Sequence, residues 1–202
     1  EAVTCGEGPL LVLAGAGSGK TRVIAYRVAW LTGAQSVSPR NLIAVTFTNK
    51  AAGEMARRVD DLLLPAGLRA PLIATFHSTC VRMLRQHGKH IGLPPQFLIY
   101  DEDDRQALVK ECLKEGELAD RSFTPSAAVH KLSYLKNQMT SVAEALRDAR
   151  GPWEKKVALV YSRYEKQLRA AGAVDFDDLL LMTVRLLQEV PEVLAWYRGL
   201  WR

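Results

Sequence analysis

The sequence predicts an α/β protein that consists of a parallel sheet with crossover helices and an all-helical inserted subdomain. Between residues 10 and 90, a short apolar run is followed three times by a loop and then by a segment with helical periodicity. After Pro94 and Pro95 this alternation gives way to successive helical segments. Hydrophobic residues make up 48% and charged residues 24% of the chain, which is typical of a packed globular protein.

Each of the three repeats pairs one expected strand with one expected helix. The strands are expected at residues 10–14, 42–47 and 72–76. The helices are expected to begin at Lys20, Asn49 and His77 and to end near Leu31, Leu64 and His90. The first strand is a continuous apolar run, so we expect it to be buried on both faces.

Residues 98–173 form the expected helical insertion, because no further clear parallel strand follows Gly92. Asp101 to Asp104 lie where a helix N-terminus favours negative charge. A long helix is expected from Pro152 or Trp153 to about Ala171, where Gly172 ends it.

The chain is expected to return to the sheet domain after the insertion. Two more helices divided near Pro191 are predicted there, the first capped by Asp175. The predicted organisation is therefore a sheet domain of residues 1–97 and 174–202 with the insertion at 98–173.

Charge and cysteine content narrow the class of protein only slightly. The net charge of +5 suits a polyanionic partner. Cys5, Cys80 and Cys112 are far apart and odd in number, which argues against a disulfide framework or a zinc site. The apolar run at residues 10–14 is too short to span a membrane. We therefore expect reduced thiols, a cytoplasmic location and no membrane partner.

A glycine-rich loop between the first expected strand and its helix predicts a phosphate-binding loop. Its residues are Ala14, Gly15, Ala16, Gly17, Ser18, Gly19, Lys20 and Thr21. The glycines allow backbone N–H groups to curve around an anion at a helix N-terminus. Lys20 is expected to reach the β- and γ-phosphates and the Thr21 hydroxyl to coordinate Mg²⁺. The expected cofactors are thus ATP and Mg²⁺.

One position departs from the strict pattern GxxxxGK[ST], because Ala14 stands where that pattern has glycine. The loop can accept the small methyl group. The alternative is a glycine-rich turn before a helix with an exposed lysine, but the strand, the glycines and the GKT string together favour nucleotide binding. The loop alone does not distinguish kinases, motors and GTPases, since all of them use it.

Further motifs narrow this choice. In chain order, they are AGAGSGKTRV at 14–23, TFTNKAAGEMARR at 46–58, ATFHSTCVRMLR at 74–85, FLIYDEDD at 97–104 and DFDDLLLMTVRLL at 175–187. Together they resemble the motifs of the UvrD, PcrA and Rep group of superfamily 1 DNA helicases. The resemblance spans essentially the whole chain and is weakest between about residues 115 and 155.

The resemblance implies a P-loop NTPase of RecA-like fold with an inserted helical subdomain. It implies the N-terminal part of an ATP-dependent 3′ to 5′ helicase acting on single-stranded DNA and on single-strand/double-strand junctions, as in DNA repair. A second motor domain elsewhere in the helicase chain would be its partner. The oligomeric state is left open.

Two segments at the carboxyl ends of the second and third strands are expected to contact single-stranded DNA, as the resemblance implies. They are Phe47, Thr48, Asn49 and Lys50, and Thr75, Phe76, His77 and Ser78. An aromatic ring can stack on a base, and the polar groups can donate to phosphates. The alternative is that Phe47 packs in the core and Lys50 is solvated. No catalytic role is assigned to His77, which has no acidic partner in the sequence pattern.

Other polar residues leave alternatives open. Arg22 either reaches the nucleotide base or ribose, as the resemblance suggests, or is an ordinary exposed helix residue. Asp175, Asp177 and Asp178 have a spacing that could hold a cation, but a helix cap in a solvated or ion-paired acidic turn is the preferred interpretation.

Basic side chains of the insertion either contact duplex phosphates or form a solvated face. They are Arg121, Lys131, Lys136, Arg147, Lys155, Lys156, Arg163 and Arg169.

Some elements that the family uses are not in the sequence. The resemblance implies an adenine-reading glutamine before Glu1 and a strand with the Walker B carboxylates after Arg202. We therefore expect Lys20 and Thr21 to be the catalytic residues present, and these 202 residues alone not to hydrolyse ATP quickly. The alternatives are the motor portion of a helicase-nuclease and a module that binds nucleotide or single-stranded DNA without turnover.

Overall fold

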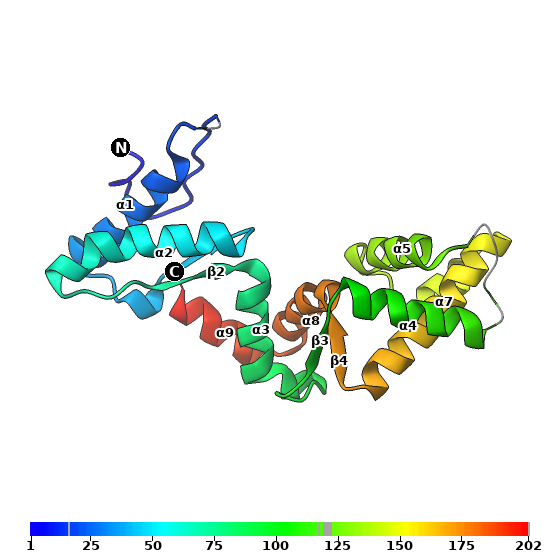
Figure 1. The fold of residues 1–202 in the computed structure, drawn as a ribbon. Coiled ribbons are helices and arrows are strands. Elements are labelled where there is room, and N and C mark those ends of the chain that lie inside the picture. Colours follow the sequence, from blue (N-terminus) through cyan, green and yellow to red (C-terminus); the bar gives the residue numbers. More distant parts are fainter. Residues whose placement is uncertain (16, 117, 119–122, 202) are drawn as a thin grey trace. The chain divides into compact units, whose positions relative to one another are not determined.

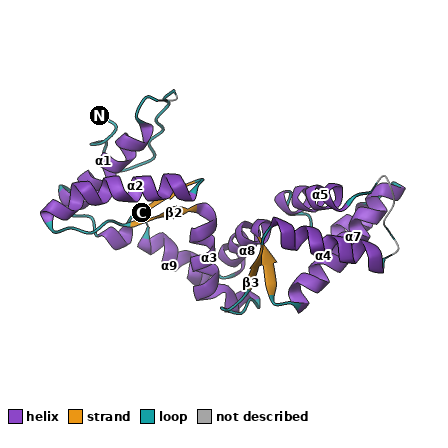
Figure 2. Cartoon of the chain, in the orientation of Figure 1, coloured by secondary structure: helices purple, strands orange, loops and turns teal. Residues whose placement is uncertain are grey.

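The computed structural model describes residues 1–15, 17–116, 118 and 123–201, which are traced from N- to C-terminus in Figure 1. They form two compact units, one of Glu1–Thr79 and Pro191–Arg202 and the other of Cys80–Val190. Helices predominate, and the described strands form two small parallel sheets (Figure 2). The predicted mixed α/β class with parallel strands is thus confirmed.

The first unit pairs two parallel strands with helices. Its elements are α1 (Lys20–Gly33), the 3-10 helix η1 (Pro39–Asn41), β1 (Ile43–Thr46), α2 (Asn49–Leu63), the 3-10 helix η2 (Leu64–Ala66), β2 (Leu72–Thr75), the first residues of α3 (Phe76–His87), and α9 (Pro191–Leu200). Strands β1 and β2 pair from Ile43 opposite Leu72 to Thr46 opposite Thr75. The residues that follow the two strands are therefore neighbours at one edge of the sheet.

The core of the first unit lies between α1, α2 and the sheet. The Thr48 side chain accepts a hydrogen bond from the Ala51 N–H and so caps α2. One face of α2 is apolar at helical spacing, and this face packs against α1 and the sheet. The core residues are Ala25, Val28, Ala44, Met55, Val59 and Leu63. This packing positions the first turn of α1 and the carboxyl ends of both strands.

The second unit is mainly helical. Its elements are the rest of α3, the 3-10 helix η3 (Gly88–Ile91), β3 (Leu98–Tyr100), α4 (Glu102–Glu115), α5 (Pro125–Asn137), α6 (Val142–Asp148), α7 (Pro152–Ala170), β4 (Ala173–Asp175) and α8 (Phe176–Glu189). Helices α4, α5 and α7 pack against one another (Figure 1). Val109, Leu132 and Tyr164 are fully buried between them.

Several predicted helix boundaries of the second half are confirmed. Asp101 caps α4 in a reciprocal arrangement with Asp104, in which each side chain accepts a hydrogen bond from the other residue's backbone N–H. Asp175 caps α8 in the same way. Helix α7 begins at Pro152, and Gly172, with φ of 61°, lies just beyond its end. The predicted division near Pro191 separates α8 from α9.

The prediction of a first strand at residues 10–14 is wrong. Residues 10–14 form no strand, and Leu11 and Leu13 are 81% and 86% exposed instead of buried. A strand needs a neighbour to satisfy its N–H and C=O groups. Within the described residues, β1 pairs with β2 and β3 with β4, and no strand pairs with residues 10–14.

The expectation of no further parallel strand after Gly92 is also wrong. Strands β3 and β4 pair in parallel, with Leu98 opposite Ala173 and Tyr100 opposite Asp175. Each has three residues, which is too short to display a period of two.

The predicted insertion, residues 98–173, lies within the second unit, which also includes residues 80–97 and 174–190. Its separation from a RecA-like domain stays a prediction. No helix among the described residues is long and apolar enough to cross a membrane.

Candidate nucleotide and nucleic-acid sites

The predicted phosphate loop leads directly into α1. Gly17 and Gly19 have φ of 76° and 86°, a region that favours glycine because it has no Cβ atom. Gly19 precedes Lys20 as the cap position of α1 and provides no side-chain acceptor. The first N–H groups of α1 therefore lack a side-chain cap, and they are the donors that an anion at a helix N-terminus would use. Ala16 lies outside the described residues.

Lys20 folds back over this loop. Its Nζ donates to the carbonyl oxygens of Ala14 at 2.8 Å and Gly15 at 2.6 Å. The Ser18 hydroxyl also donates to Gly15 O, at 2.6 Å. Lys20, Ser18 and Gly15 are all exposed to solvent. The ammonium group is thus held beside the loop backbone by neutral acceptors that a stronger anionic acceptor can replace.

Thr21 and Arg22 extend the same surface. Thr21 is half-buried in the first turn of α1, directly after Lys20. Arg22 is exposed, and its Nε lies 3.9 Å from the position that a Cβ atom on Gly19 would take. Loop backbone, ammonium, hydroxyl and guanidinium groups are therefore gathered at one helix end, and their chemistry fits a phosphate chain and a hydroxyl-ligated Mg²⁺ ion.

Two aromatic rings meet at the carboxyl edge of the β1–β2 sheet. The ring centroids of Phe47 and Phe76 are 5.6 Å apart with an interplanar angle of 42°. Phe47 is 89% exposed and Phe76 is 44% exposed. The alternative in which Phe47 packs in the core is wrong, because the strand pairing brings both rings to the surface.

The polar residues beside these rings divide into exposed and structural groups. Asn49 and Lys50 are exposed in the first turn of α2. The Thr75 Oγ1 is engaged in the start of α3, because it donates to Ser78 Oγ at 2.9 Å and accepts from the Ser78 N–H at 3.1 Å. Thr48 is engaged as the cap of α2.

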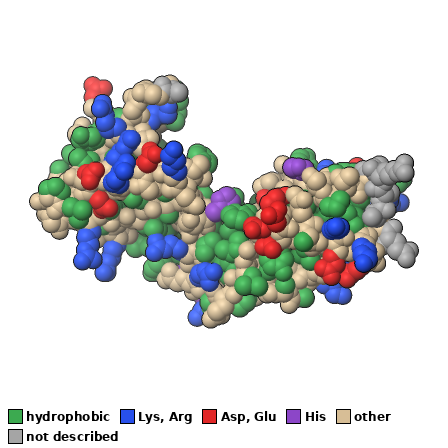
Figure 3. Space-filling model, in the orientation of Figure 1, with side chains coloured by type: hydrophobic (Ala, Val, Ile, Leu, Met, Phe, Trp, Pro, Cys, Tyr) green, Lys and Arg blue, Asp and Glu red, His purple; other side chains and the backbone are tan. Residues whose placement is uncertain are grey.

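His77 is half-buried at the start of α3. Ser78 remains exposed. Lys and Arg side chains gather over the α1 and α2 part of the face shown in Figure 3, with a few Asp and Glu among them. The residues predicted to bind nucleotide and single-stranded DNA all belong to the first unit.

A buried ion cluster surrounds the predicted acidic turn. The Lys136 ammonium contacts Asp175 Oδ2 at 2.8 Å, Asp178 Oδ1 at 2.7 Å and Glu165 Oε1 at 2.8 Å. Burial acts to lower the pKa of Lys136, but the three carboxylates outweigh it and raise this pKa above its ordinary value. Burial raises the pKa of Asp178 to about 6. The acidic turn is therefore ion-paired inside the second unit, as the preferred interpretation expects.

Arg105 completes this cluster from α4. It contacts Asp177 Oδ2 at 2.9 Å and donates to Ser133 Oγ at 2.6 Å. The Tyr164 hydroxyl donates to Asp175 Oδ2 at 2.8 Å. Sequence patterns missed Arg105 and Tyr164 because their partners are distant in the chain.

For Lys136, both alternatives considered for the basic residues of the insertion are wrong. With 1% of its side chain exposed, it neither reaches duplex phosphates nor belongs to a solvated face. Arg121, from the same set, lies outside the described residues.

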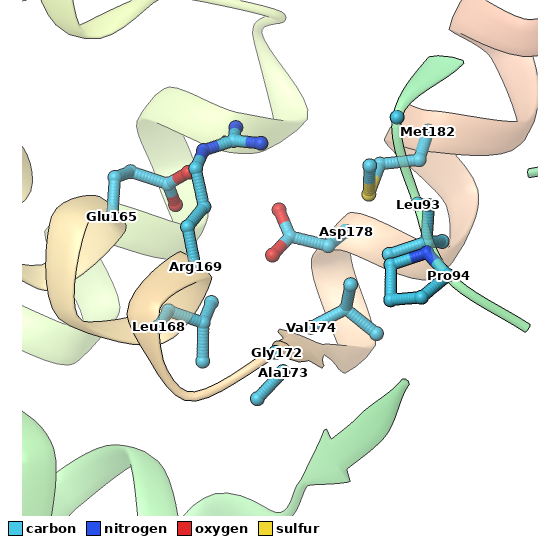
Figure 4. A pocket seen from close by; sticks show the side chains of 11 residues that line it. Leu93, Pro94, Glu165, Leu168, Arg169, Gly172, Ala173, Val174, Asp178 and Met182 are labelled. Atoms are coloured by element: carbon cyan, nitrogen blue, oxygen red, sulfur yellow. The ribbon is translucent and has the colours of Figure 1, made fainter. Parts of the chain in front are cut away.

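A pocket of about 140 Å³ lies next to this cluster in the second unit. Figure 4 shows Asp178 and Glu165 in its wall together with Leu168, Val174 and Met182. It includes no residue of the phosphate loop or of the aromatic edge, and both carboxylates already pair with Lys136. The pocket is thus separate from the predicted nucleotide and DNA sites.

Comparison with known proteins gives consistent matches along the chain. The family model described as UvrD/REP helicase N-terminal domain matches residues 1–202. The ATP-dependent DNA helicase PcrA of Staphylococcus aureus (strain Mu50) is 45% identical over 201 residues, covering 98% of this chain and 27% of that protein. PcrA of Staphylococcus epidermidis is 44% identical over 201 residues, with the same coverage. The chain therefore spans 27% of the length of these curated relatives.

Proposed function

The chain belongs to the UvrD/REP helicase N-terminal domain family, and on this premise we propose that it is the N-terminal part of an ATP-dependent 3′ to 5′ DNA helicase. In this proposal it binds ATP with Mg²⁺ and single-stranded DNA, and acts at single-strand/double-strand junctions. Residues 1–97 and 174–202 are the ATP-binding, RecA-like part, and residues 98–173 are its inserted helical subdomain. The rest of the helicase chain contributes a second motor domain.

The observation that carries the proposal is the glycine-rich loop with Lys20 held over its backbone at the uncapped start of α1. A phosphate oxygen with full negative charge forms stronger hydrogen bonds than a neutral carbonyl. ATP would thus draw Lys20 Nζ from Ala14 O and Gly15 O onto its β- and γ-phosphates. The first N–H groups of α1 would hold the same phosphates.

Thr21 and Arg22 have supporting roles in this arrangement. The Thr21 hydroxyl would be a ligand of Mg²⁺, which when bound neutralises charge between the β- and γ-phosphates. Arg22 would reach the ribose or base, since its guanidinium lies beside Gly19. Lys20 and Thr21 would be the catalytic residues of this part, because they touch the phosphates or the metal during phosphoryl transfer.

Single-stranded DNA would lie along the carboxyl edge of the β1–β2 sheet. Phe47 and Phe76 offer exposed ring faces to the bases. Lys50, Asn49 and Ser78 are exposed beside the rings and can donate to phosphates. Thr48 and Thr75 would act mainly through the helix starts that they cap, and His77, in the first turn of α3, would be part of the binding surface.

The test measures two ligands separately, with a fluorescent ATP analogue and a labelled single-stranded oligonucleotide. Lys20→Ala is expected to abolish analogue binding and leave oligonucleotide binding intact. Phe47→Ala is expected to weaken oligonucleotide binding about ten-fold, since one base–aromatic stack contributes ~1–3 kcal/mol, and to leave analogue binding intact. Tyr26→Ala is the matched control, because Tyr26 is an exposed aromatic residue on α1 that is not among the predicted DNA-binding residues.

The outcomes separate the proposal from its alternatives. Loss of both ligands in both variants would point to unfolding and would leave neither assignment supported. If the whole protein binds the ATP analogue and single-stranded DNA but does not hydrolyse ATP, the result would favour a binding module. DNA-stimulated ATP hydrolysis with unwinding of a duplex that has a 3′ tail is the result expected of the helicase.

A further inference from the structure

Arg27, about two helical turns after Lys20 on α1, binds the N-terminal segment of the chain through several backbone carbonyls. Its Nη1 donates to Cys5 O at 2.9 Å, Ala2 O at 3.2 Å and Val3 O at 3.3 Å. Its Nη2 donates to Gly6 O at 3.3 Å. One half-buried guanidinium group therefore holds residues 2–6 against α1.

This contact closes a loop on a single helix. Residues 7–19 begin at the segment held by Arg27 and end where the chain enters α1 at Lys20. Residues 7–15 are all exposed, so packing contributes little to their order. Gly15, Gly17 and Gly19 add backbone freedom to the same loop. The two anchored ends thus restrain the phosphate loop together with the hydrogen bonds that Lys20 and Ser18 make to the loop backbone.

We propose that Arg27 is a positioning residue for nucleotide binding, because its grip on residues 2–6 pre-organises the phosphate loop. This inference rests on the proposed function of that loop. A loop whose two ends are fixed samples fewer conformations, so less entropy is lost when its N–H groups wrap around phosphate. Arg27 itself touches no phosphate in this proposal.

The geometry favours an arginine, because four carbonyl oxygens surround the two Nη atoms. The planar guanidinium presents five N–H donors in a fixed fork, which suits several carbonyl oxygens arranged around one side chain. A lysine keeps the positive charge but has one nitrogen at the end of a flexible stem. Arg27→Lys therefore separates the effect of charge from that of the multiple hydrogen bonds.

The experiment compares Arg27→Ala, Arg27→Lys and wild type in the whole protein. Arg58→Ala is the matched control, since Arg58 is an exposed arginine on the neighbouring helix α2, and Lys20→Ala is the reference without phosphate binding. The readouts are the Kd of a fluorescent ATP analogue, KM and kcat for DNA-stimulated ATP hydrolysis, amide hydrogen exchange and the thermal midpoint.

Arg27→Ala is expected to raise Kd and KM roughly five- to ten-fold with kcat at saturating ATP unchanged. Amide exchange should accelerate in residues 7–15 and 17–19 but not in α2. Arg27→Lys should lie between Arg27→Ala and wild type. Unchanged Kd in Arg27→Ala overturns the inference, and so does accelerated exchange throughout the first unit, which would mark a general structural role. If wild type binds no analogue, the proposed function itself fails; if Lys20→Ala abolishes binding but Arg27→Ala does not affect it, only this inference fails.

Discussion

Lys136 shows at the scale of single residues how a buried charge depends on its partners. Its ammonium group donates hydrogen bonds to Asp175 and Asp178 and forms an ion pair with Glu165, all at 2.7–2.8 Å. Lys136→Met is expected to lower the free energy of unfolding by about 3–5 kcal/mol, because it leaves Asp178 buried without its cation and leaves Asp175 only the Arg105 guanidinium at 3.5 Å. Chemical denaturation measures this loss. Lys155→Met, at an exposed position of α7, is the control and should change stability by less than ~0.5 kcal/mol.

The Asp178 carboxyl predicts a pH dependence in the same cluster. Burial raises its pKa from 3.8 to about 6 in the folded protein. Between these two values the folded state binds more protons than the unfolded state, so stability should fall as pH rises. The lowered pKa of Asp175 acts in the opposite direction, as pH falls below 3.8.

The measurement compares wild type with Asp178→Asn by denaturation at pH 4, 5 and 6. Wild type should lose about 1–3 kcal/mol relative to the variant across this range. Parallel pH profiles for the two proteins would contradict the assignment of the proton to Asp178.

Residue-scale prediction from sequence succeeded where a local pattern sufficed. The cap role of Asp175 follows from its place before an apolar helix, and the structure confirms it. The exposure of Phe47 and the burial of Lys136 depend on strand pairing and on partners far along the chain. Neither can be deduced from the neighbours of a residue in the sequence.

The start of α4 gives a prediction at the scale of one element. Asp101 accepts from the Asp104 N–H at 3.0 Å, and Asp104 accepts from the Asp101 N–H at 3.1 Å. Asp101→Ala removes the acceptor for one first-turn N–H and should cost about 1 kcal/mol. Asp103→Ala, at an exposed position in the same turn, is the matched control for charge near the helix dipole. Equal losses in the two variants, measured by thermal unfolding, would show that charge and not capping stabilises α4.

Elements with long amphipathic patterns were predictable, while those defined by pairing were not. Helix α2 combines a cap at Thr48 with apolar positions at helical spacing, and the structure follows that pattern. Residues 10–14 have the composition of a buried strand but no partner strand among the described residues. Strands β3 and β4 have only three residues each, yet they pair because the chain brings them together across the helices between them. Hydrogen-bonding partners, not local propensity, decided these cases.

At the scale of the whole molecule, each unit has its own hydrophobic core. Val59 is fully buried with Met55 and Leu63 in the first unit, and Leu132 is fully buried with Val160 in the second. Such separate cores are expected to unfold as separate cooperative units. The proposed nucleotide and DNA sites lie in the first unit alone, so their ligands should stabilise that unit selectively.

Calorimetry of the chain should therefore show two unfolding transitions. A substitution in each core should identify which unit unfolds in which transition. Val59→Ala is expected to lower the midpoint of one transition and Leu132→Ala that of the other, by the loss of ~2–5 kcal/mol that follows truncation of a buried aliphatic side chain. Leu64→Ala and Leu159→Ala, at exposed positions of the first and second unit, should shift neither. ATP with Mg²⁺ should raise only the transition that Val59→Ala lowers, and Lys20→Ala should abolish this shift. A single transition lowered by both core variants would show that the two cores unfold together, and nucleotide would then stabilise the whole chain instead of one unit.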